Sequence, residues 1–489
     1  MKFINHSLST QVLTDGQLTL SYSKITPVFE ELDRFFGDRN IDRGDRLALE
    51  CVNSVPCALV LLYLLEREYS FLLFSRAANT SEENKPEIPP FCHYGLQIDS
   101  SPEAPETESE ILFHRDRGLK IWENSLWMGK NSSSEELKPT LYLRTSGSTG
   151  NPKLVAHSHA NLRNNILNCA ERLNLRSGDR IAIPVPIFHL YGLGAGFLPG
   201  VMVGASIDLQ KGANLLRYLQ REREFNPNVA FMTPIFCETL LRGRRSPRPY
   251  KLTVAAGDRV REDTFKQYND RFGCLVKLYG STEMGAIAAG SPDDTLEVRD
   301  RTVGQPMPGV QMRLEEQSFE NIEEMEGTGE LWCKHNCGFE GYIDEKGNPL
   351  LSETGDWFRT KDFGRIGKDG LEVIGRCDHS VNRNGLLVFF TDVEKAIESI
   401  AGIEKVVVVS KGESQRGKKL FAYCIPAKDT KVEVIATDIR SHCFDLLPRH
   451  AIPDEIIIEK TLPLLPNGKV DRQKLTQKVD WDTIHQNNT

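Results

Sequence analysis

The segment from Leu141 to Lys153 combines the residue types that bind a phosphate group. An apolar, strand-like start leads into a loop of hydroxyls and glycines that ends on a lysine. Glycines allow the backbone to approach a ligand closely, hydroxyls donate to phosphate oxygens or ligate magnesium, and lysine supplies positive charge. We therefore predict a phosphate-binding loop, with Thr145 also a candidate magnesium ligand, formed by Thr145, Ser146, Gly147, Ser148, Thr149, Gly150 and Lys153.

The spacing of this loop argues against two common nucleotide-binding motifs. Gly147-x-x-Gly150-x-Pro-Lys153 does not fit the G-x-x-x-x-G-K-[ST] loop of ATPases and GTPases. It does not fit the G-x-G-x-x-G turn of dinucleotide-binding folds either. For the loop taken by itself, the alternative is a solvated turn rich in serine, threonine and glycine.

The ordered run Thr-Ser-Gly-Ser-Thr-Gly-x-Pro-Lys resembles the phosphate loop of the adenylate-forming superfamily. That superfamily includes acyl-CoA synthetases, aryl-CoA ligases, luciferases and the adenylation domains of peptide synthetases. Further segments resemble motifs of the same superfamily, in the same order along the chain, and these are 186–192, 279–283, 357–362, 375–378 and 462–472.

The resemblance implies an ATP site built from the middle of the chain. In Tyr279-Gly280-Ser-Thr282-Glu283, the aromatic ring would stack on adenine, Thr282 would donate to the α-phosphate and Glu283 would hold magnesium. The small residues ending at Gly257 are expected to line the adenine and acyl sites, where they let a flat ring approach the backbone.

A second group of implied ATP ligands follows near the end of the large domain. Asp362 matches the aspartate that accepts hydrogen bonds from both ribose hydroxyls, but Lys361 stands where the family has a glycine. If that position needs a positive φ, the lysine costs on the order of 1 kcal/mol. Arg376 is expected to hold ribose or phosphate, and Asp378 is expected to act as the hinge.

Two residues are the predicted catalytic groups. His189, in Pro-Ile-Phe-His-Leu-Tyr-Gly, matches the acid-pocket motif of acyl- and aryl-CoA ligases and would lie near the substrate carboxylate. A lone histidine in an apolar run is more often a core residue. Lys469, after a Pro-Asn-Gly turn, matches the lysine that bridges carboxylate and α-phosphate, where its charge brings two anions together. By itself, such a lysine is ordinarily solvated.

The elements that must position these residues indicate an α/β fold. At 489 residues the chain exceeds the roughly 250–300 residues of a single core, so at least two domains are expected. Alternating strand and helix patterns predict a layered, largely parallel sheet with ligands at the strand ends. We expect a large domain of layered sheets and helices over 1–376 and a small, mobile α+β lid over 377–489, whose first helix follows a capping box from Thr391 to Glu394.

Composition argues against several other classes of protein. The formal net charge of −8 gives no basic surface for nucleic acid. The longest apolar run, from Cys57 to Leu65, is shorter than the ~20 residues of a membrane span. The N-terminus carries no apolar signal core and the eleven cysteines form no framework, so we expect a cytoplasmic protein with reduced thiols. Cys333-Lys-His335-Asn-Cys337 lacks the second ligand pair of a zinc site.

The resemblance to the adenylate-forming superfamily implies an AMP-forming acid–thiol ligase that uses ATP and Mg²⁺. The acid would be adenylated with release of pyrophosphate, and then transferred to the pantetheine thiol of CoA or of a separate acyl or peptidyl carrier protein. Phe188-His189 favours an acid without an α-amino group, because members that take amino acids usually place an aspartate there. Three alternatives remain: an amino-acid-activating domain that loads a carrier protein, a luciferase-like monooxygenase, and a binding protein that has lost catalysis, which Lys361 favours.

Overall fold

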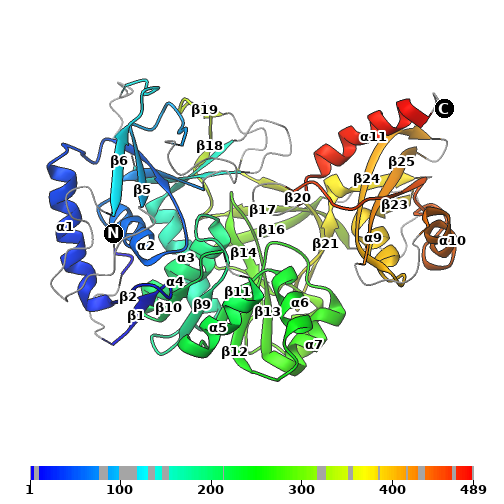
Figure 1. Ribbon diagram of the computed structural model, residues 1–489, viewed down its shortest axis with the longest axis horizontal. Coiled ribbons are helices and arrows are strands. Elements are labelled where there is room, and N and C mark those ends of the chain that lie inside the picture. Colours follow the sequence, from blue (N-terminus) through cyan, green and yellow to red (C-terminus); the bar gives the residue numbers. More distant parts are fainter. Residues whose placement is uncertain are drawn as a thin grey trace. The chain divides into compact units, whose positions relative to one another are not determined.

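The computed structural model describes residues 2–4, 10–75, 86–98, 118–129, 138–145, 153–212, 214–315, 327–350, 356–383, 386–414, 417–427, 435–464 and 470–486. The chain divides into two compact units (Figure 1). The first contains Met1–Met312, Cys333–Phe358 and Gly367–Glu372, and the second contains Arg313–Trp332, Arg359–Ile366 and Val373–Thr489. The predicted α/β class, with a large N-terminal part and a small C-terminal part, is confirmed. The predicted boundary between residues 376 and 377 stays a prediction.

The first unit contains a nine-stranded sheet among its described residues. Its order is β15 (Gln305–Pro306), β14 (Gly285–Ala289), β13 (Gly273–Ser281), β12 (Tyr250–Ala255), β11 (Val229–Met232), β9 (Arg180–Ile183), β10 (Ser206–Leu209), β1 (Val12–Thr14) and β2 (Thr19–Ser21). The strands from β13 to β1 in this order pair in parallel, as the alternation of strands and helices predicts.

A second, eight-stranded sheet carries the phosphate loop. Its order is β19 (Pro349–Leu350), β18 (Gly341–Ile343), β8 (Leu154–Ser158), β7 (Thr140–Arg144), β4 (Ser70–Phe74), β3 (Arg46–Glu50), β5 (Tyr94–Ile98) and β6 (Leu119–Glu123). Strands β7, β4, β3 and β5 pair in parallel, while β8 and β18 continue the sheet antiparallel. The expected strand at Leu141–Leu143 is therefore present within β7.

Helices separate and cover these two sheets. They are α1 (Ile25–Gly37), α2 (Val55–Glu66), α3 (His159–Arg172), a π-helix (Tyr191–Phe197), α4 (Leu198–Val203), α5 (Leu215–Phe225), α6 (Pro234–Gly243), α7 (Glu262–Phe272) and α8 (Leu296–Arg301), with a short 3₁₀ turn at Tyr22–Lys24. Alternate residues of one strand face different layers, so Ile181 and Ile183 join the central core with α2, whereas Ala182 packs with α6 and α7. Helices α5, α6 and α7 lie beside β11, β12 and β13 in Figure 1.

A four-stranded sheet contributes residues to both units. Its order is β16 (Val310–Glu315), β17 (Thr328–His335), β20 (Phe358–Gly367) and β21 (Gly370–Arg376). In the second unit, a five-stranded sheet has the order β23 (Leu386–Phe389), β22 (Ser380–Arg383), β25 (Gly417–Pro426) and β24 (Ile403–Ser414), with β26 (Glu455–Ile458) pairing beside β25.

Helices cover both faces of that five-stranded sheet. They are α9 (Phe390–Glu398), α10 (Ala436–Leu446) and α11 (Arg472–Gln486), and Figure 1 shows α9 and α11 on opposite sides of β24, with a short 3₁₀ turn at Cys377–His379 preceding β22. Along β24, Val406 and Val408 pack with α9 and α10, while Val407 and Val409 pack with α11. This alternation gives the compact α+β unit that the sequence predicts.

The capping box predicted at Thr391–Glu394 is wrong. Helix α9 begins earlier, with Phe389 at its N-cap, and no side chain caps it. The Glu394 carboxylate instead accepts a hydrogen bond from the Val408 amide at 2.7 Å. A tertiary contact with β24 has therefore replaced the local contact that the sequence pattern predicts.

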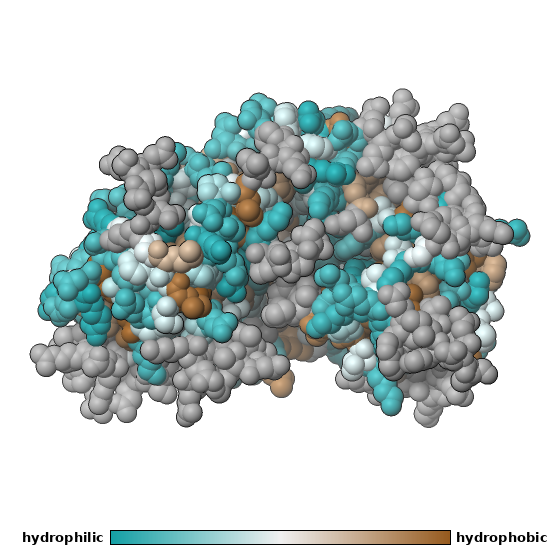
Figure 2. All heavy atoms as spheres, turned by 90° about the horizontal axis from the view of Figure 1, so that it is seen from above, coloured by the Kyte–Doolittle hydropathy of each residue, from teal (hydrophilic) through white to brown (hydrophobic). Residues whose placement is uncertain are grey.

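In the part of the chain that the structure describes, no helix is long and apolar enough to cross a membrane. On the face that Figure 2 draws, the described residues are mostly hydrophilic, with smaller hydrophobic areas among them.

Candidate active site

The phosphate loop connects two antiparallel strands, β7 and β8. Its described ends meet closely, since the Thr145 amide donates to the Lys153 carbonyl oxygen at 3.0 Å and the Thr145 hydroxyl lies 3.3 Å from the same oxygen. The residues between them that we predict to bind phosphate, 146–150, lie outside the described residues. The hairpin therefore fixes Thr145 and Lys153 side by side at the mouth of the loop.

Strand β18 brings an additional residue, Tyr342, next to Lys153. It pairs with β8 in the register Tyr342↔Val155, and the Lys153 ammonium lies 5.2 Å from the centroid of the Tyr342 ring. An ammonium over the face of an aromatic ring is attracted by the negative charge of that face. Sequence reasoning missed Tyr342, because nothing local to Gly341-Tyr342 indicates that this strand adds to the phosphate-loop sheet.

The same tyrosine reaches the predicted magnesium ligand. The Tyr342 hydroxyl donates to Glu283 Oε1 at 2.8 Å. Among the described residues, none hydrogen-bonds the other carboxylate oxygen, Oε2. Burial, and next the charge of Glu283, raise the pKa of Tyr342, so the phenol keeps its proton and stays a donor.

Three backbone carbonyls around Glu283 are held by other segments of the first unit. His157 Nε2 donates to the Thr282 oxygen at 2.7 Å, and the Phe339 amide donates to the Glu283 oxygen at 2.8 Å. The Met284 oxygen lies 2.8 Å from His335 Nδ1, and Asn165 donates to it as well. This turn is therefore anchored by strand β8, helix α3 and the segment 335–339, which positions Glu283 before any ligand binds.

Of the two histidines in this arrangement, His157 is buried and His335 is half-buried, and burial favours the neutral form of each ring. Burial lowers the pKa of His157 to about 4, against the opposing effect of its hydrogen bond to the Thr282 carbonyl. Burial also lowers the pKa of His335. In Cys333-Lys-His335-Asn-Cys337, Cys333 is buried within β17, so His335 and Cys333 serve packing and turn geometry here.

Two glycines of the predicted nucleotide site meet conformational needs. A Cβ on Gly280 would lie 2.3 Å from the Gly285 carbonyl oxygen, so the β13–β14 hairpin requires glycine at this position. Gly257 follows β12 with φ of +93°, which side chains rarely adopt. Tyr279 is half-buried at the end of β13 and packs beside a small core formed by Met284, Ile287 and Cys333.

The predicted ribose ligand lies in the second unit with Arg376. Arg376 donates to Asp362 Oδ1 at 3.5 Å, and the Asp362 amide donates to the Thr360 hydroxyl at 3.1 Å. Lys361 has φ of +62°, so the conformation that the family glycine suggested is the one adopted here. The lysine side chain is exposed. The strain at Lys361 has therefore left the contact between Asp362 and Arg376 in place.

His189 lies between β9 and the π-helix. Its ring is tilted against Phe188, with centroids 4.4 Å apart, and its backbone oxygen accepts a hydrogen bond from Leu193 at 2.9 Å. The neighbouring Tyr191 hydroxyl donates to the Met232 and Val254 carbonyl oxygens at 2.9 and 2.8 Å. These hydrogen bonds hold the segment of the predicted acid pocket against β11 and β12.

Lys469 and the side chain of the predicted hinge residue Asp378 lie outside the described residues. The described residues on either side of Lys469 are joined, because Leu464 and Val470 form an antiparallel bridge and the Asp471 amide donates to the Pro463 oxygen at 2.8 Å. Arg472 anchors this segment further by an ion pair of 2.7 Å with Glu394 of α9.

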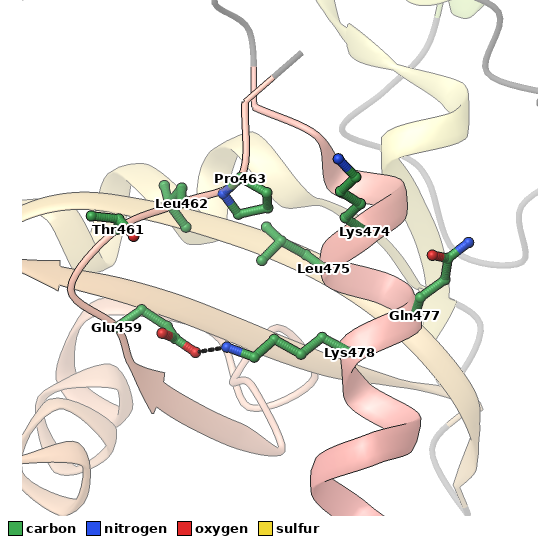
Figure 3. A pocket seen from close by; sticks show the side chains of 8 residues that line it. All are labelled: Glu459, Thr461, Leu462, Pro463, Lys474, Leu475, Gln477 and Lys478. Carbon is green, nitrogen blue, oxygen red and sulfur yellow. Dashed lines mark hydrogen bonds and ion pairs between the residues drawn. The ribbon is translucent and has the colours of Figure 1, made fainter. Parts of the chain in front are cut away.

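A shallow groove lies beside this segment in the second unit. Figure 3 shows Leu462, Pro463 and Leu475 facing one another between the chain before Leu464 and helix α11. Its lysines are already matched by acids, since Lys478 pairs with Glu459 and Lys474 lies 3.7 Å from Asp471. Each of the two lysines that line the groove therefore has an acidic neighbour.

Residues 71–343 match the family described as AMP-binding enzyme, and residues 392–469 match the AMP-binding enzyme C-terminal domain. The chain is 27% identical, over 439 residues, to the benzoate–CoA ligase of Thauera aromatica, covering 86% of this chain and 80% of that protein. It is also 27% identical, over 354 residues, to the mitochondrial medium-chain acyl-CoA ligase ACSF2 of Macaca fascicularis, covering 69% of this chain. The matched region spans 56% of the length of ACSF2.

Solved structures share the fold. ATP-bound MatB from Rhodopseudomonas palustris has a TM-score of 0.75 at 18% identity over 96% of both chains. The o-succinylbenzoate CoA synthetase MenE from Bacillus subtilis, in complex with its acyl-adenylate intermediate, has a TM-score of 0.75 at 18% identity over 95% of both chains. With its ordered motifs and two family matches, the chain belongs to the AMP-binding enzymes of the adenylate-forming superfamily.

Proposed function

We propose that this protein activates a carboxylic acid that lacks an α-amino group and transfers it to the thiol of CoA. The observation that carries this proposal is the arrangement of Lys153, Tyr342 and Glu283 at the mouth of the phosphate loop. It offers a cation for phosphate and a carboxylate whose Oε2 accepts no hydrogen bond from a described residue, and both are groups of the kind that bind MgATP. The proposal is supported by the likeness to proteins named as acyl- and benzoate–CoA ligases.

The residues present fit magnesium and ATP. Glu283, with Thr145 as a second candidate, would hold the metal, and the bound metal would offset charge on the phosphates. Lys153 and the loop amides would hold the phosphates, Tyr279 and Gly257 would border adenine, and the pair formed by Asp362 and Arg376 would hold ribose, with His189 at the acid.

In the first proposed step, a carboxylate oxygen attacks the α-phosphorus, the bond to the β-phosphate oxygen breaks, and pyrophosphate leaves. Lys469 draws the two anions together and offsets charge on the phosphorus. In the second step, the thiol loses its proton, its sulfur attacks the acyl carbonyl carbon and AMP leaves. A turn of the C-terminal part about Asp378 separates the two steps.

The choice of acid follows from the acid-pocket motif. Phe188 and His189 stand where a pairing aspartate would serve an α-ammonium group, so an aryl or aliphatic acid is the proposed substrate class. CoA is the proposed acceptor because the named relatives are CoA ligases. A phosphopantetheine-bearing carrier protein is the second candidate acceptor.

The test is product analysis with a panel of aryl acids, short to long fatty acids and amino acids. Purified protein is incubated with ATP, Mg²⁺ and either CoA or a phosphopantetheinylated carrier protein, and AMP and thioester are quantified by mass spectrometry. We expect AMP and acyl-CoA in equal amounts with one class of non-amino acid. Thioester formed only with amino acids, or only on the carrier protein, would overturn the corresponding part of the proposal.

One sequence feature favours a binding protein that has lost catalysis, namely lysine in place of the family glycine at position 361. That alternative predicts MgATP binding without AMP formation for any acid in the panel. The retained contact between Asp362 and Arg376 opposes it.

A further inference from the structure

Tyr342 contacts two groups of opposite charge. Its hydroxyl donates to Glu283 Oε1 at 2.8 Å, while the Lys153 ammonium lies over its ring, 5.2 Å from the centroid. These contacts use different parts of the same side chain, the phenol oxygen for the carboxylate and the ring face for the ammonium. One residue therefore fixes both partners at once.

The Tyr342 ring is itself held firmly. It packs edge-on against Phe339, with centroids 4.9 Å apart and planes 73° apart, and Phe339 in turn packs against Phe358. The Phe339 amide also donates to the Glu283 carbonyl oxygen at 2.8 Å. Side chain and backbone of Glu283 are thus positioned by neighbouring residues of a single short segment.

Because both groups contact Tyr342, the Lys153 ammonium and the Glu283 carboxylate do not pair with each other. In the part of the chain that the structure describes, Lys153 makes no ion pair with a carboxylate, and its ammonium lies over the Tyr342 ring. Opposite charges attract one another, most strongly where water is excluded. The Lys153 ammonium contacts the ring face of Tyr342 and Glu283 accepts from its hydroxyl, so each charge is held by Tyr342 rather than by the other charge.

We infer that Tyr342 is a positioning residue for MgATP, which orients Glu283 toward the metal and keeps Lys153 from pairing with Glu283. This inference rests on the proposed function, because it takes MgATP as the ligand. It goes beyond that function by assigning a separate task to each part of one side chain.

Two variants separate the two tasks. Tyr342→Phe keeps the ring over Lys153 and removes only the hydrogen bond to Glu283. Tyr342→Leu removes both. Binding is measured by isothermal titration calorimetry, with ATP in excess Mg²⁺ and with ATP in EDTA, so that the metal-dependent part of the affinity is read separately.

For Tyr342→Phe we expect about a tenfold loss of MgATP affinity, which is the scale for losing a hydrogen bond to a charged group. ATP affinity in EDTA should be unchanged, because Glu283 acts through the metal. For Tyr342→Leu we expect a larger loss with Mg²⁺ and also a loss in EDTA, since Lys153 can then pair with Glu283.

Tyr22→Phe is the matched control. The Tyr22 hydroxyl donates to the Ala205 carbonyl oxygen at 2.9 Å in the core of the same unit, and neither residue has a predicted ligand role. This variant loses a buried phenol hydrogen bond of similar length, so it should match Tyr342→Phe in thermal stability while keeping both affinities.

Three results would overturn the inference. Tyr342→Phe could bind MgATP like the wild type, or it could lose affinity equally with and without Mg²⁺, as a merely structural residue would. Wild-type protein that binds no MgATP would overturn the proposed function and the inference together. Wild type that binds MgATP but forms no AMP with any acid overturns the proposed catalysis alone.

Discussion

His157 Nε2 lies 2.7 Å from the carbonyl oxygen of Thr282, and this contact ties the strand after the phosphate loop to the turn that carries Glu283. The ring is 2% exposed, and its pKa is lowered to about 4 by burial. Burial therefore favours the neutral form of this ring in the folded state, although its hydrogen bond to the Thr282 carbonyl acts in the opposite direction.

We predict an acid-sensitive contribution to stability from His157. Between its ordinary pKa of 6.5 and its folded value of about 4, the unfolded chain binds a proton that the folded chain does not. The contribution of neutral His157 to the free energy of unfolding is therefore fully present above pH 6.5. It is lost as the pH falls toward 4, and the total loss is about 3 kcal/mol. Urea unfolding followed by tryptophan fluorescence from pH 7.5 to 4.5 measures this loss.

His157→Gln is the matched variant, because glutamine can donate to the same carbonyl and does not titrate. Its unfolding free energy should fall less steeply over this pH range than that of the wild type. Parallel pH profiles for the two proteins would show that protonation of His157 is not linked to folding.

The second prediction concerns Lys361, whose φ is +62°. Replacing it by glycine removes the steric cost of the left-handed conformation, so Lys361→Gly should raise the free energy of unfolding of the second unit by about 1 kcal/mol. Thermal and denaturant unfolding provide the measurement.

Arg365→Gly is the control for that substitution. Arg365 is exposed in the same strand, β20, and lacks a positive φ. Glycine there should lower stability by roughly 0.5–1 kcal/mol, the ordinary entropic cost of glycine in a strand. Loss of stability of the same size in both variants would contradict the assignment of strain to Lys361.

The third prediction concerns the ion pair of 2.7 Å between Arg472 and Glu394, which holds the chain after Lys469. Arg472→Met would leave a buried carboxylate without its partner, at a cost of about 3–5 kcal/mol. Burial already raises the pKa of Glu394. Lowering the pH should therefore recover part of the lost stability, because the variant's carboxyl becomes neutral.

The double variant Arg472→Met/Glu394→Gln tests that explanation. It removes both charges, so its stability should be higher than that of Arg472→Met and independent of this carboxyl's titration. If the double variant is as unstable as the single one at every pH, the stranded charge is not the cause.

Much of the fold could be predicted from short sequence patterns, because burial of apolar residues and allowed backbone angles depend on residues close together in the chain. The apolar run from Cys57 to Leu65, for example, lies within helix α2 and is buried throughout. The need for glycine-like geometry at position 361 could be predicted in the same way, from a single motif position.

The contacts that complete the site could not be predicted, because they join segments far apart in the chain. Tyr342 and Glu283 are separated by 59 positions, and His157 and Thr282 by 125. Glu394 is a further example. The local pattern predicts that it caps its own helix, but its carboxylate instead contacts Val408 and Arg472, which lie far away in the sequence. Such pairs depend on sheet order, which one sequence does not specify.

The measurement that tests the central claim most directly is carboxylate-dependent exchange of pyrophosphate into ATP. Wild type, Lys469→Ala and the control Lys460→Ala are compared, since Lys460 is an exposed lysine of the same unit with no predicted role. We predict exchange with one class of non-amino acid, strongly reduced in Lys469→Ala and unchanged in Lys460→Ala. Folded wild-type protein that binds MgATP but shows no exchange with any acid would contradict the proposed activity.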